Sequence, residues 1–397
     1  MDKKRKTIGL VFTGNENWVG GLYYIVNIIK AIALLPKNNQ PKIILLYDKS
    51  TPEDLLNEVN FDFVKLVNLY QINLFKRLFF SFLFRVLHRN YIFNYQVKKH
   101  SINLLYPFNN YHKDLEFVPC DIYYWLFDFQ HKFLPDLFST DEIKKRDNDF
   151  ELIANKAKHI IVSSNNAKNH FYKYFPNSKA KLSVLKFASI IDESKLTSFD
   201  ILKEKYPISK PYFLVSNQFW QHKNHMVVLK AINELRNQIK DVLILFTGKD
   251  YDPRNPEYII GLKKYISDNN LNDSTRFLGF ISREDQLGLM KNSIAVIQPS
   301  KFEGWGTVVE DAKSLAVPVI LSDIEIHRGQ LPEGEFFGED DFMQLARILL
   351  TTEGAEKHRK KEKINHRAHS ENKNIELSDT NRDYYLGFAE QIVRVFG

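Results

Sequence analysis

Short apolar runs alternate with longer amphipathic segments along this 397-residue chain, and no other feature constrains its fold as strongly. A run such as KIILLY (42–47) has the length of a buried strand, whereas GLYYIVNIIKAIALL (21–35) has the length and pattern of a helix. Strands joined through helices pair in parallel and are covered on both faces, so the alternation predicts an α/β protein. The predicted strands are 7–13, 42–47, 102–107, 121–127, 159–164, 212–217, 242–248, 276–280, 294–300 and 317–323.

The alternation starts again after ISKP (208–211), which predicts two doubly wound, Rossmann-like domains. We assign residues 1–200 to the first domain and 201–378 to the second. The amphipathic segment 379–397 is expected to be a helix that packs back on the first domain. Ligands of such sheets bind beyond the carboxyl ends of the strands, here in a cleft expected between the two domains.

Charge and composition restrict the partners of the chain. The formal net charge of +7 favours an anionic partner, but no nucleic-acid-binding motif accompanies the charge, which argues against nucleic acid. Cys120 is the single cysteine, so no disulfide can form within the chain. The start of the chain lacks the apolar region of a signal peptide, and no run is long enough to span a bilayer. We expect a cytoplasmic protein, either soluble or at the inner face of the membrane.

The stretch FEGWGTVVEDAKSLAVPVI (302–320) is the best candidate for a ligand site. Glu303 follows a predicted strand, and a predicted helix begins shortly after it. Asp311 lies in this helix, about 7 Å along its axis from the start. Glycines in the turn let the backbone approach a ligand, and free amides at a helix start suit a phosphate. Two carboxylates so placed can bracket a sugar nucleotide. The ligand-binding residues expected in the turn are Gly304, Trp305, Gly306 and Thr307.

This stretch resembles the signature of family 4 glycosyltransferases, also called glycosyl transferases group 1. The resemblance implies a GT-B fold, in which two Rossmann-like domains face a central cleft and the second binds most of a nucleotide sugar. Members carry two glutamates separated by seven residues. Glu303 matches the first, which contacts the transferred sugar, and Asp311 takes the place of the second, which grips the ribose. Glu310 points about 100° away on the helix and is expected at the surface.

Two other segments of the second half resemble the same family. SNQFWQHKNH (216–225) is similar to its phosphate loop, in which an arginine and a lysine hold the diphosphate. Lys223 matches the lysine, but the arginine position falls on Asn217 or Gln218, so one positive charge is missing. An ordinary surface lysine is the alternative for Lys223. The backbone of RFLGFIS (276–282) is implied to meet the base, at Phe280 and Ile281.

The first half offers weaker candidates. The pair Gly20 and Gly21 resembles the family loop beneath the donor diphosphate, and a tight turn without a ligand is the alternative. The chain has no G-x-G-x-x-G here, which argues against a dinucleotide dehydrogenase. His131 is the candidate for the family histidine near the reacting sugar, with Asp128 as an acceptor-side residue. Phe127 occupies another alignment of that histidine, and a histidine bonded to a backbone carbonyl is the plainer interpretation.

The segment 73–100 mixes aromatic and basic side chains. Leu74, Leu78, Phe82 and Val86 follow a helical period. We favour a helix that faces the core and has basic flanks. The alternative is a basic amphipathic helix that lies on an anionic membrane and helps to dock a lipid-linked acceptor.

No metal or other cofactor is expected. Asp250 and Asp252 have the D-x-D spacing of metal-dependent glycosyltransferases of another fold, but they lie in a segment with turn chemistry. His222 and His225 could mimic a metal pair, and we expect them only to flank a turn.

The resemblance implies a retaining glycosyltransferase of the hexosyltransferase type. It would move a sugar from a nucleotide-diphosphate sugar to a glycan or lipid-linked acceptor, in the synthesis of cell-surface polysaccharide or glycoconjugate. Lys223 and the helix amides would stabilise the charge on the leaving diphosphate, so Lys223 joins Glu303 and His131 as a candidate catalytic residue. The alternatives are an epimerase or phosphorylase of the same fold, or a nucleotide-sugar-binding protein without transfer activity.

Overall fold

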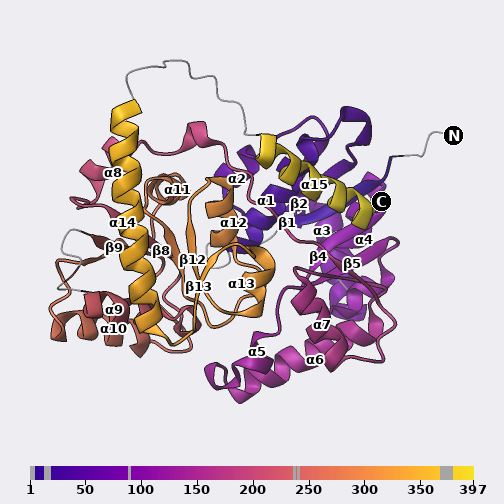
Figure 1. The fold of residues 1–397 in the computed structure, drawn as a ribbon. Helices are drawn as coiled ribbons and strands as arrows, with labels where there is room; N and C mark the ends of the chain where they lie inside the picture. The colour runs from indigo at the N-terminus through magenta and orange to yellow at the C-terminus, as the bar shows by residue number, and fades with distance from the viewer. Residues whose placement is uncertain (1–4, 13–18, 88–90, 236–237, 239–241, 367–378) are drawn as a thin grey trace. The chain divides into compact units, whose positions relative to one another are not determined.

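The computed structural model describes residues 5–12, 19–87, 91–235, 238, 242–366 and 379–397. These residues form two compact units (Figure 1). The first unit contains residues 1–129, 140–190 and 378–397, and the second contains 130–139 and 191–377. Residues 130–139 therefore group with the second unit, although the chain on both sides of them belongs to the first.

The first unit is built on a parallel sheet of seven strands in the order β3-β2-β1-β4-β5-β6-β7. Its central strands are apolar on both faces because helices cover both. The strands are β1 (Thr7–Phe12), β2 (Lys42–Tyr47), β3 (Val64–Asn68), β4 (Leu104–Phe108), β5 (Asp121–Leu126), β6 (His159–Val162) and β7 (Lys181–Val184). The helices are α1 (Val19–Ala33), α2 (Glu53–Asn57), α3 (Leu74–Leu87), α4 (Ile92–His100), α6 (Thr140–Lys156), α7 (Asn165–Tyr174) and α15 (Asp379–Phe396).

The second unit has a parallel sheet of six strands in the order β10-β9-β8-β11-β12-β13. The strands are β8 (Tyr212–Ser216), β9 (Leu243–Thr247), β10 (Thr275–Phe277), β11 (Val296–Gln298), β12 (Val319–Ser322) and β13 (Glu335–Phe337). The helices are α5 (Gln130–Phe133), α8 (Phe199–Lys205), α9 (His225–Leu235), α10 (Glu257–Asp268), α11 (Arg283–Lys291), α12 (Thr307–Ser314), α13 (Glu325–Gln330) and α14 (Phe342–His366). The two parallel sheets confirm the predicted α/β class.

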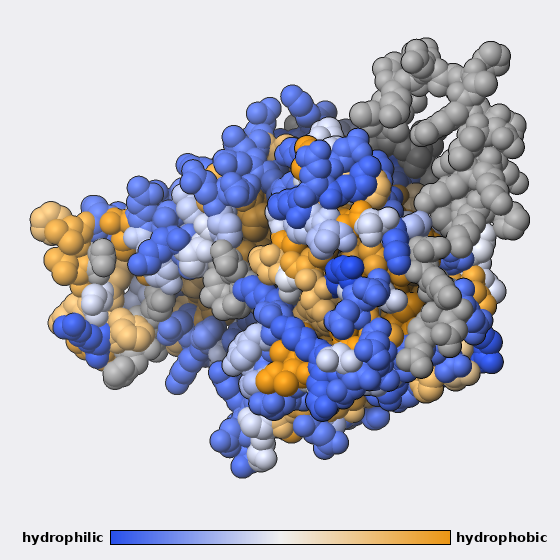
Figure 2. Space-filling view, turned by 90° about the vertical axis from the view of Figure 1, so that its left-hand side faces the viewer, coloured by the Kyte–Doolittle hydropathy of each residue, from blue (hydrophilic) through white to orange (hydrophobic). Residues whose placement is uncertain are grey.

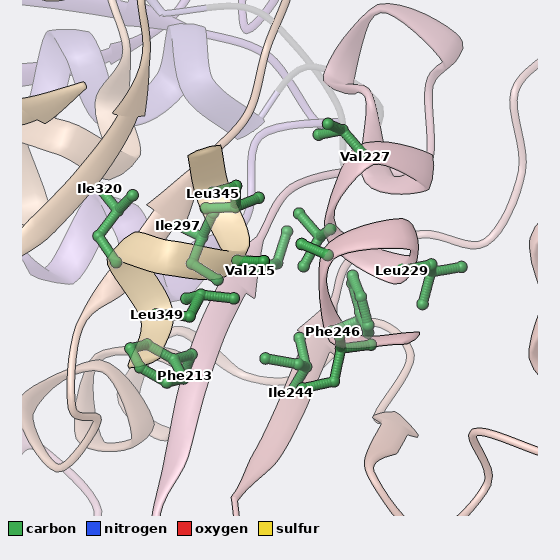
Figure 3. Close-up of a cluster of buried hydrophobic side chains, with 14 of the residues drawn as sticks. Phe213, Val215, Val227, Leu229, Ile244, Phe246, Ile297, Ile320, Leu345 and Leu349 are labelled. Atoms are coloured by element: carbon green, nitrogen blue, oxygen red, sulfur yellow. The ribbon is translucent and has the colours of Figure 1, made fainter. Parts of the chain in front are cut away.

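Alternate residues of the second sheet enter separate cores on its two faces. Phe213, Val215 and Phe246 pack with α9, α10 and α14 on one face, and Figure 3 shows side chains of this cluster. Leu214 and Leu245 point to the other face, where they pack with α11 and α12. This two-sided burial explains why β8 and β9 read as continuous apolar runs rather than as alternating ones.

The last helix, α15, belongs to the first unit and lies against α1. Its apolar side includes Tyr385 and Phe396, both buried. The Phe396 ring lies 5.2 Å from that of Tyr106 on β4, and the Phe396 carbonyl accepts a hydrogen bond from Lys6 Nζ at 3.4 Å. The amphipathic pattern of the segment thus buries one face against the N-terminal sheet.

The face drawn in Figure 2 is largely hydrophilic, with hydrophobic side chains gathered in a few places. Across the part of the chain that the structure describes, none of the helices is both long and apolar enough to cross a bilayer.

Candidate active site

Lys223 and Glu303 meet at the carboxyl edge of the second sheet. Lys223 ends a short turn that follows β8, and Glu303 lies in the turn that follows β11. Because β8 and β11 are neighbours in a parallel sheet, their carboxyl ends emerge side by side. Lys223 Nζ lies 2.5 Å from Glu303 Oε1. Two residues 80 positions apart, both predicted to bind the donor, are therefore in direct contact.

The pair keeps Glu303 ionised. Burial disfavours the carboxylate, and the Glu303 side chain is only 10% exposed, but the positive charge of Lys223 prevails and lowers the pKa of Glu303 to about 2. Burial also lowers the pKa of the neighbouring His222 to about 3, so this imidazole is neutral near pH 7. At neutral pH the site thus combines one cation with one carboxylate that can only accept hydrogen bonds.

Two amide side chains extend this pair back to β8. Gln298 Nε2 donates to Glu303 Oε1 at 2.8 Å, and Asn217 Nδ2 donates to Gln298 Oε1 at 2.9 Å. Asn217 is buried directly after β8. Asn217, one of the two positions considered for the family arginine, therefore carries a side chain that orients the Glu303 network. Gln218, the other position considered, is half-buried.

Asp311 lies in a second network, on α12. Its carboxylate is held by both Nη atoms of Arg283, with Nη1 2.6 Å from Oδ2, in a bidentate pair. Arg283 Nη1 also donates to Gln286 Oε1 at 3.2 Å, and Gln286 Nε2 donates to Ser216 Oγ at 2.6 Å. Ser216 precedes Asn217 in the chain. The two networks therefore meet at the carboxyl end of β8.

Sequence reasoning missed Arg283. The only available signal was its position at the first residue of a helix that follows a strand, after Ser282. Ser282 caps that helix, because its Oγ accepts a hydrogen bond from the Asp285 backbone N–H at 3.2 Å.

Glu310 is buried, so the prediction that it lies at the surface is wrong. Its side chain accepts a hydrogen bond from Gln330 Nε2 at 2.7 Å and one from Lys313 Nζ at 3.3 Å. The residue is 0% exposed because α12 is covered on more than one side: Val309 faces the sheet core, and Glu310 faces the end of α13.

The turn before α12 is hydrogen-bonded to Gln330, the glutamine that also contacts Glu310. The Gly306 N–H donates to Gln330 Oε1 at 3.1 Å, and Gln330 Nε2 donates to the Gly306 carbonyl at 2.8 Å. A Cβ at Gly306 would lie 3.2 Å from Val309 Cγ2, so a larger residue here would require that side chain to shift. The Gly306 amide is thus used within the protein. The amides of the first turn, from Thr307 onward, have no acceptor within the helix and are the ones suited to a phosphate. Gly304 and Trp305, both half-buried, complete this turn.

The loops after β8, β9 and β10 are closely packed. Gly248 follows β9 with a φ of +148°, and a Cβ there would lie 2.2 Å from the Asn217 carbonyl oxygen. The Gly248 N–H donates to the Gly279 carbonyl at 2.9 Å. Glycine is therefore required where the β9 loop crosses the loop that carries Asn217.

The segment predicted to meet the base follows Gly279. The Phe280 ring is 56% exposed, and Lys249 Nζ lies 5.3 Å from its centre. Ile281 is half-buried and packs against the core beneath α11 and α12. Phe280 thus offers an open aromatic face at the same edge of the sheet.

The candidates near the junction of the units lie in different units. Asp128 is in the first unit, with its Oδ1 3.9 Å from Arg146 Nη1. His131 is in the second unit, on α5, and is 1% exposed with its ring 6.3 Å from that of Phe138. The α5 segment approaches the Glu303 turn, because the Phe133 ring lies 5.5 Å from that of Phe302.

Gly20 and Gly21 lie in the first turn of α1. Gly20 is exposed, and a Cβ there would meet nothing within 4 Å, so packing does not explain this glycine. Gly21 is buried. Residues 13–18 of the same predicted loop lie outside the described residues.

The residues considered as metal ligands have other partners. Asp252 accepts hydrogen bonds from the backbone N–H groups of Gln221 at 3.0 Å and Arg254 at 2.9 Å. His225 stacks on Phe219 with the ring centres 4.6 Å apart. Within the described ranges, no group of His, Cys, Asp or Glu side chains is arranged to hold a metal ion.

The first unit has a cavity of about 330 Å³ that sequence reasoning missed. It lies at the carboxyl ends of β1 to β5, where an α/β sheet binds its ligands. Its polar lining residues come from loops after these strands, which carry no motif that would have identified them. They include Asp48, Tyr70, Asn109, His112 and Asp114.

Solved structures that superimpose on this chain identify its fold. Sucrose-phosphate synthase from Thermosynechococcus elongatus superimposes with a TM-score of 0.60, at 15% identity over 99% of this chain and 95% of that chain. HepE from Anabaena, in complex with UDP and glucose, gives 0.61 at 15% identity over 98% and 97%. WaaG, a glycosyltransferase involved in lipopolysaccharide biosynthesis, gives 0.58 at 12% identity over 98% and 94%. The fold is therefore GT-B, as predicted.

The family follows from the sequence of the second unit. Residues 198–369 match the model of "Glycosyl transferases group 1", so this part of the chain belongs to that family. The O-antigen chain mannosyltransferase RfbU of Salmonella typhimurium is 26% identical over 186 residues, which are 47% of this chain and 48% of that protein. The α-1,3/1,6-mannosyltransferase ALG2 of Mus musculus is 25% identical over 43% of each chain. The chain thus spans about half the length of the curated relatives it matches.

Proposed function

We propose that this protein is a retaining glycosyltransferase that moves a hexose from a nucleotide-diphosphate sugar to a glycan or lipid-linked acceptor. The observation that carries the proposal is the Lys223–Glu303 contact at the carboxyl edge of the second sheet, with the first turn of α12 following directly after it. A cation, an ionised carboxylate and free helix amides are the groups that a diphosphate and a sugar require.

Donor binding would separate Lys223 from Glu303. The diphosphate offers Lys223 more negative charge than one carboxylate does, and the amides from Thr307 onward add hydrogen bonds to the phosphate oxygens. Glu303, oriented by Gln298, would then accept hydrogen bonds from sugar hydroxyls. Lys223 stabilises the charge that develops on the leaving diphosphate, which is electrostatic catalysis.

Arg283 supplies the positive charge that the loop after β8 lacks. Asp311 retains lone pairs beyond those used by the two Nη atoms, so its carboxylate can accept ribose hydroxyls while the bidentate pair holds it. The Arg283 side chain is 19% exposed and is linked through Gln286 to Ser216, the residue before Asn217. We therefore assign to Arg283 a positioning role for the donor nucleotide, whose base would lie against Phe280 and Ile281.

Transfer with retention needs no protein base. The bond from the anomeric carbon to the diphosphate oxygen breaks, the bond to the acceptor oxygen forms on the same face, and the acceptor proton passes to the leaving phosphate. His131 would lie close to the reacting sugar. In the first unit, Asp128 would contact the acceptor, and Gly20 and Gly21 at the start of α1 would lie beneath the donor diphosphate.

The cavity of the first unit is our candidate acceptor site. Asp48, Tyr70 and His112 give it hydrogen-bonding groups for a saccharide. The curated relatives named above are mannosyltransferases, one of the O-antigen chain, which supports a mannosyl donor and a role in cell-surface polysaccharide or glycoconjugate synthesis.

Thermal unfolding with GDP-, UDP- and dTDP-sugars tests the proposal first, because a bound donor stabilises the folded state by mass action. We expect one nucleotide series to raise Tm in the wild type and to have no such effect in Lys223→Ala. Transfer to a saccharide acceptor follows with the stabilising donor. Binding without transfer to any acceptor would favour a nucleotide-sugar-binding protein, and no stabilisation by any donor would contradict the proposal.

A further inference from the structure

Helix α3 exposes more apolar surface than any requirement of the fold explains. Among the described residues, 19 large hydrophobic side chains are exposed, and eight of them belong to this 14-residue helix. Each of the eight is at least 47% exposed, and Phe75 reaches 84%. They are Leu74, Phe75, Leu78, Phe79, Phe82, Phe84, Val86 and Leu87. The interpretation of this segment as a core-facing helix is therefore wrong for α3, because the side chains assigned to the core lie in solvent.

Six of the eight exposed side chains form one face of the helix, and Phe84 and Leu87 lie outside it. At about 100° per residue, Leu74, Leu78 and Phe82 lie on an arc that Phe75, Phe79 and Val86 extend to about 140°. The full set of six is an apolar stripe of the width with which helices usually face a core.

The opposite face attaches α3 to the protein. The Phe80 ring lies 5.8 Å from that of Tyr95 on α4, and Lys76 Nζ donates to the Tyr95 hydroxyl at 3.2 Å. Phe80 and Leu83 are half-buried, in contrast to the stripe. The helix is thus held by one side and presents the apolar stripe outward.

The charged residues around α3 indicate which kind of partner covers the apolar stripe. No Asp or Glu occurs between Asp62 and Asp114, whereas eight Lys and Arg residues do. Among them, Lys76, Arg85, Lys98 and Lys99 are exposed on α3 and α4. A second copy of this chain would bring two such basic regions together, which is unfavourable. An apolar stripe within a purely basic region matches an anionic bilayer, in which acyl chains receive the stripe and phosphates receive the cations.

We infer that α3 is an interfacial helix that docks this protein on an anionic lipid bilayer. The helix is about 21 Å long, too short to span the roughly 30 Å hydrocarbon core, so it lies in the plane of the membrane. Tyr70, four residues before α3, lines the cavity of the first unit. Docking through α3 would therefore hold the loop that carries Tyr70 close to the lipid surface. The inference itself does not depend on which sugar is transferred.

Co-sedimentation with vesicles tests the inference. We expect the full-length protein to bind phosphatidylglycerol-containing vesicles at least tenfold more tightly than pure phosphatidylcholine vesicles, with affinity that falls as salt screens the charges. The triple variant Leu78→Ser, Phe79→Ser, Phe82→Ser should lose about tenfold or more of that binding. Arg85→Gln combined with Lys98→Gln and Lys99→Gln should remove the preference for anionic lipid.

A matched control substitutes equally exposed apolar residues of the second unit. Tyr251→Ser with Ile260→Ser, side chains that are 59% and 56% exposed, should leave vesicle binding unchanged. Nucleotide-induced stabilisation should be the same in the triple variant and the wild type, which separates this test from that of the glycosyltransferase activity. Equal binding of wild type and triple variant would overturn the inference. So would a lipid-free dimer that the triple variant dissociates.

Discussion

At the scale of single residues, Lys223 determines whether the buried carboxylate of Glu303 is tolerated. In Lys223→Ala the carboxylate loses its ion-pair partner, and breaking a buried pair costs about 3 kcal/mol. We expect kcat/KM for transfer to fall by about 10²-fold to 10³-fold, because charge on the leaving diphosphate is no longer stabilised. Steady-state transfer assays and urea unfolding measure both effects. Lys264→Ala, at a lysine that is 73% exposed, is the control and should change neither quantity.

Glu303 should also make stability depend on pH. Its pKa is lowered from 4.5 to about 2 in the folded protein, so its stabilising contribution is complete above the unfolded value near 4.5 and is lost as the pH falls to about 2. At about 1.4 kcal/mol per pKa unit, the loss is about 3 kcal/mol. The difference in unfolding free energy between wild type and Glu303→Gln should shrink by that amount between pH 5 and pH 2. A difference that does not change with pH would refute the assigned pKa.

Gly248 tests the packing of the loops at the site. Its φ of +148° and the short approach to the Asn217 carbonyl leave no room for a methyl group. Gly248→Ala should destabilise the protein by about 3 kcal/mol, from backbone strain and overpacking together. Gly261→Ala is the matched control, since a Cβ in that exposed position of α10 meets nothing within 4 Å. It should stabilise the helix by about 0.5 kcal/mol. Chemical denaturation compares the two, and equal effects would contradict the role given to Gly248.

At the scale of elements, α11 and α12 are joined by the Arg283–Asp311 pair. Arg283→Ala leaves the buried Asp311 carboxylate without its cation, and we expect a loss of about 3 kcal/mol together with a raised KM for the donor. Arg283→Lys keeps a positive charge but removes the fork, so it should restore part of the stability and little of the donor affinity. If Arg283→Lys restores stability and donor affinity equally, the guanidinium geometry is unimportant, and the positioning role assigned to Arg283 is wrong.

Buried elements were the predictable ones. β2 was predicted with its observed limits because it is covered on both faces and its apolar run is continuous. The edge strands β3 and β7 and the short β13 were missed, since each has a half-exposed, partly polar sequence that does not stand out from loop. An edge strand pairs with only one neighbouring strand, and only part of one of its faces is covered. Its sequence therefore need not be apolar.

The same limit applied to the candidate site. The Glu303 turn and Lys223 could be proposed as parts of one site because short motifs carry them. The Arg283–Asp311 pair could not, because it joins residues 28 positions apart through the packing of two helices. Glu310 and α3 were misjudged for a related reason: helical periodicity shows which side chains share a face, but it does not show what that face contacts.

At the scale of the whole molecule, the two units should respond to different ligands. The candidate donor site, with Lys223, Glu303 and Asp311, lies within the second unit, and the cavity proposed for the acceptor lies within the first. Hydrogen exchange can separate the two, because a bound ligand slows exchange of the amides that it contacts or stabilises. We expect nucleotide diphosphate alone to protect the start of α12 and the loops after β8 and β10.

Acceptor saccharide should instead protect the loops after β2, β3 and β4, which line the cavity. Asp48→Asn with His112→Gln should remove this second protection and leave the first intact, whereas Lys223→Ala should do the reverse. Protection of the cavity loops by the nucleotide alone would contradict this division of ligands between the units. The loss of both patterns in Asp48→Asn with His112→Gln would contradict it too, since that variant leaves every residue of the donor networks in place.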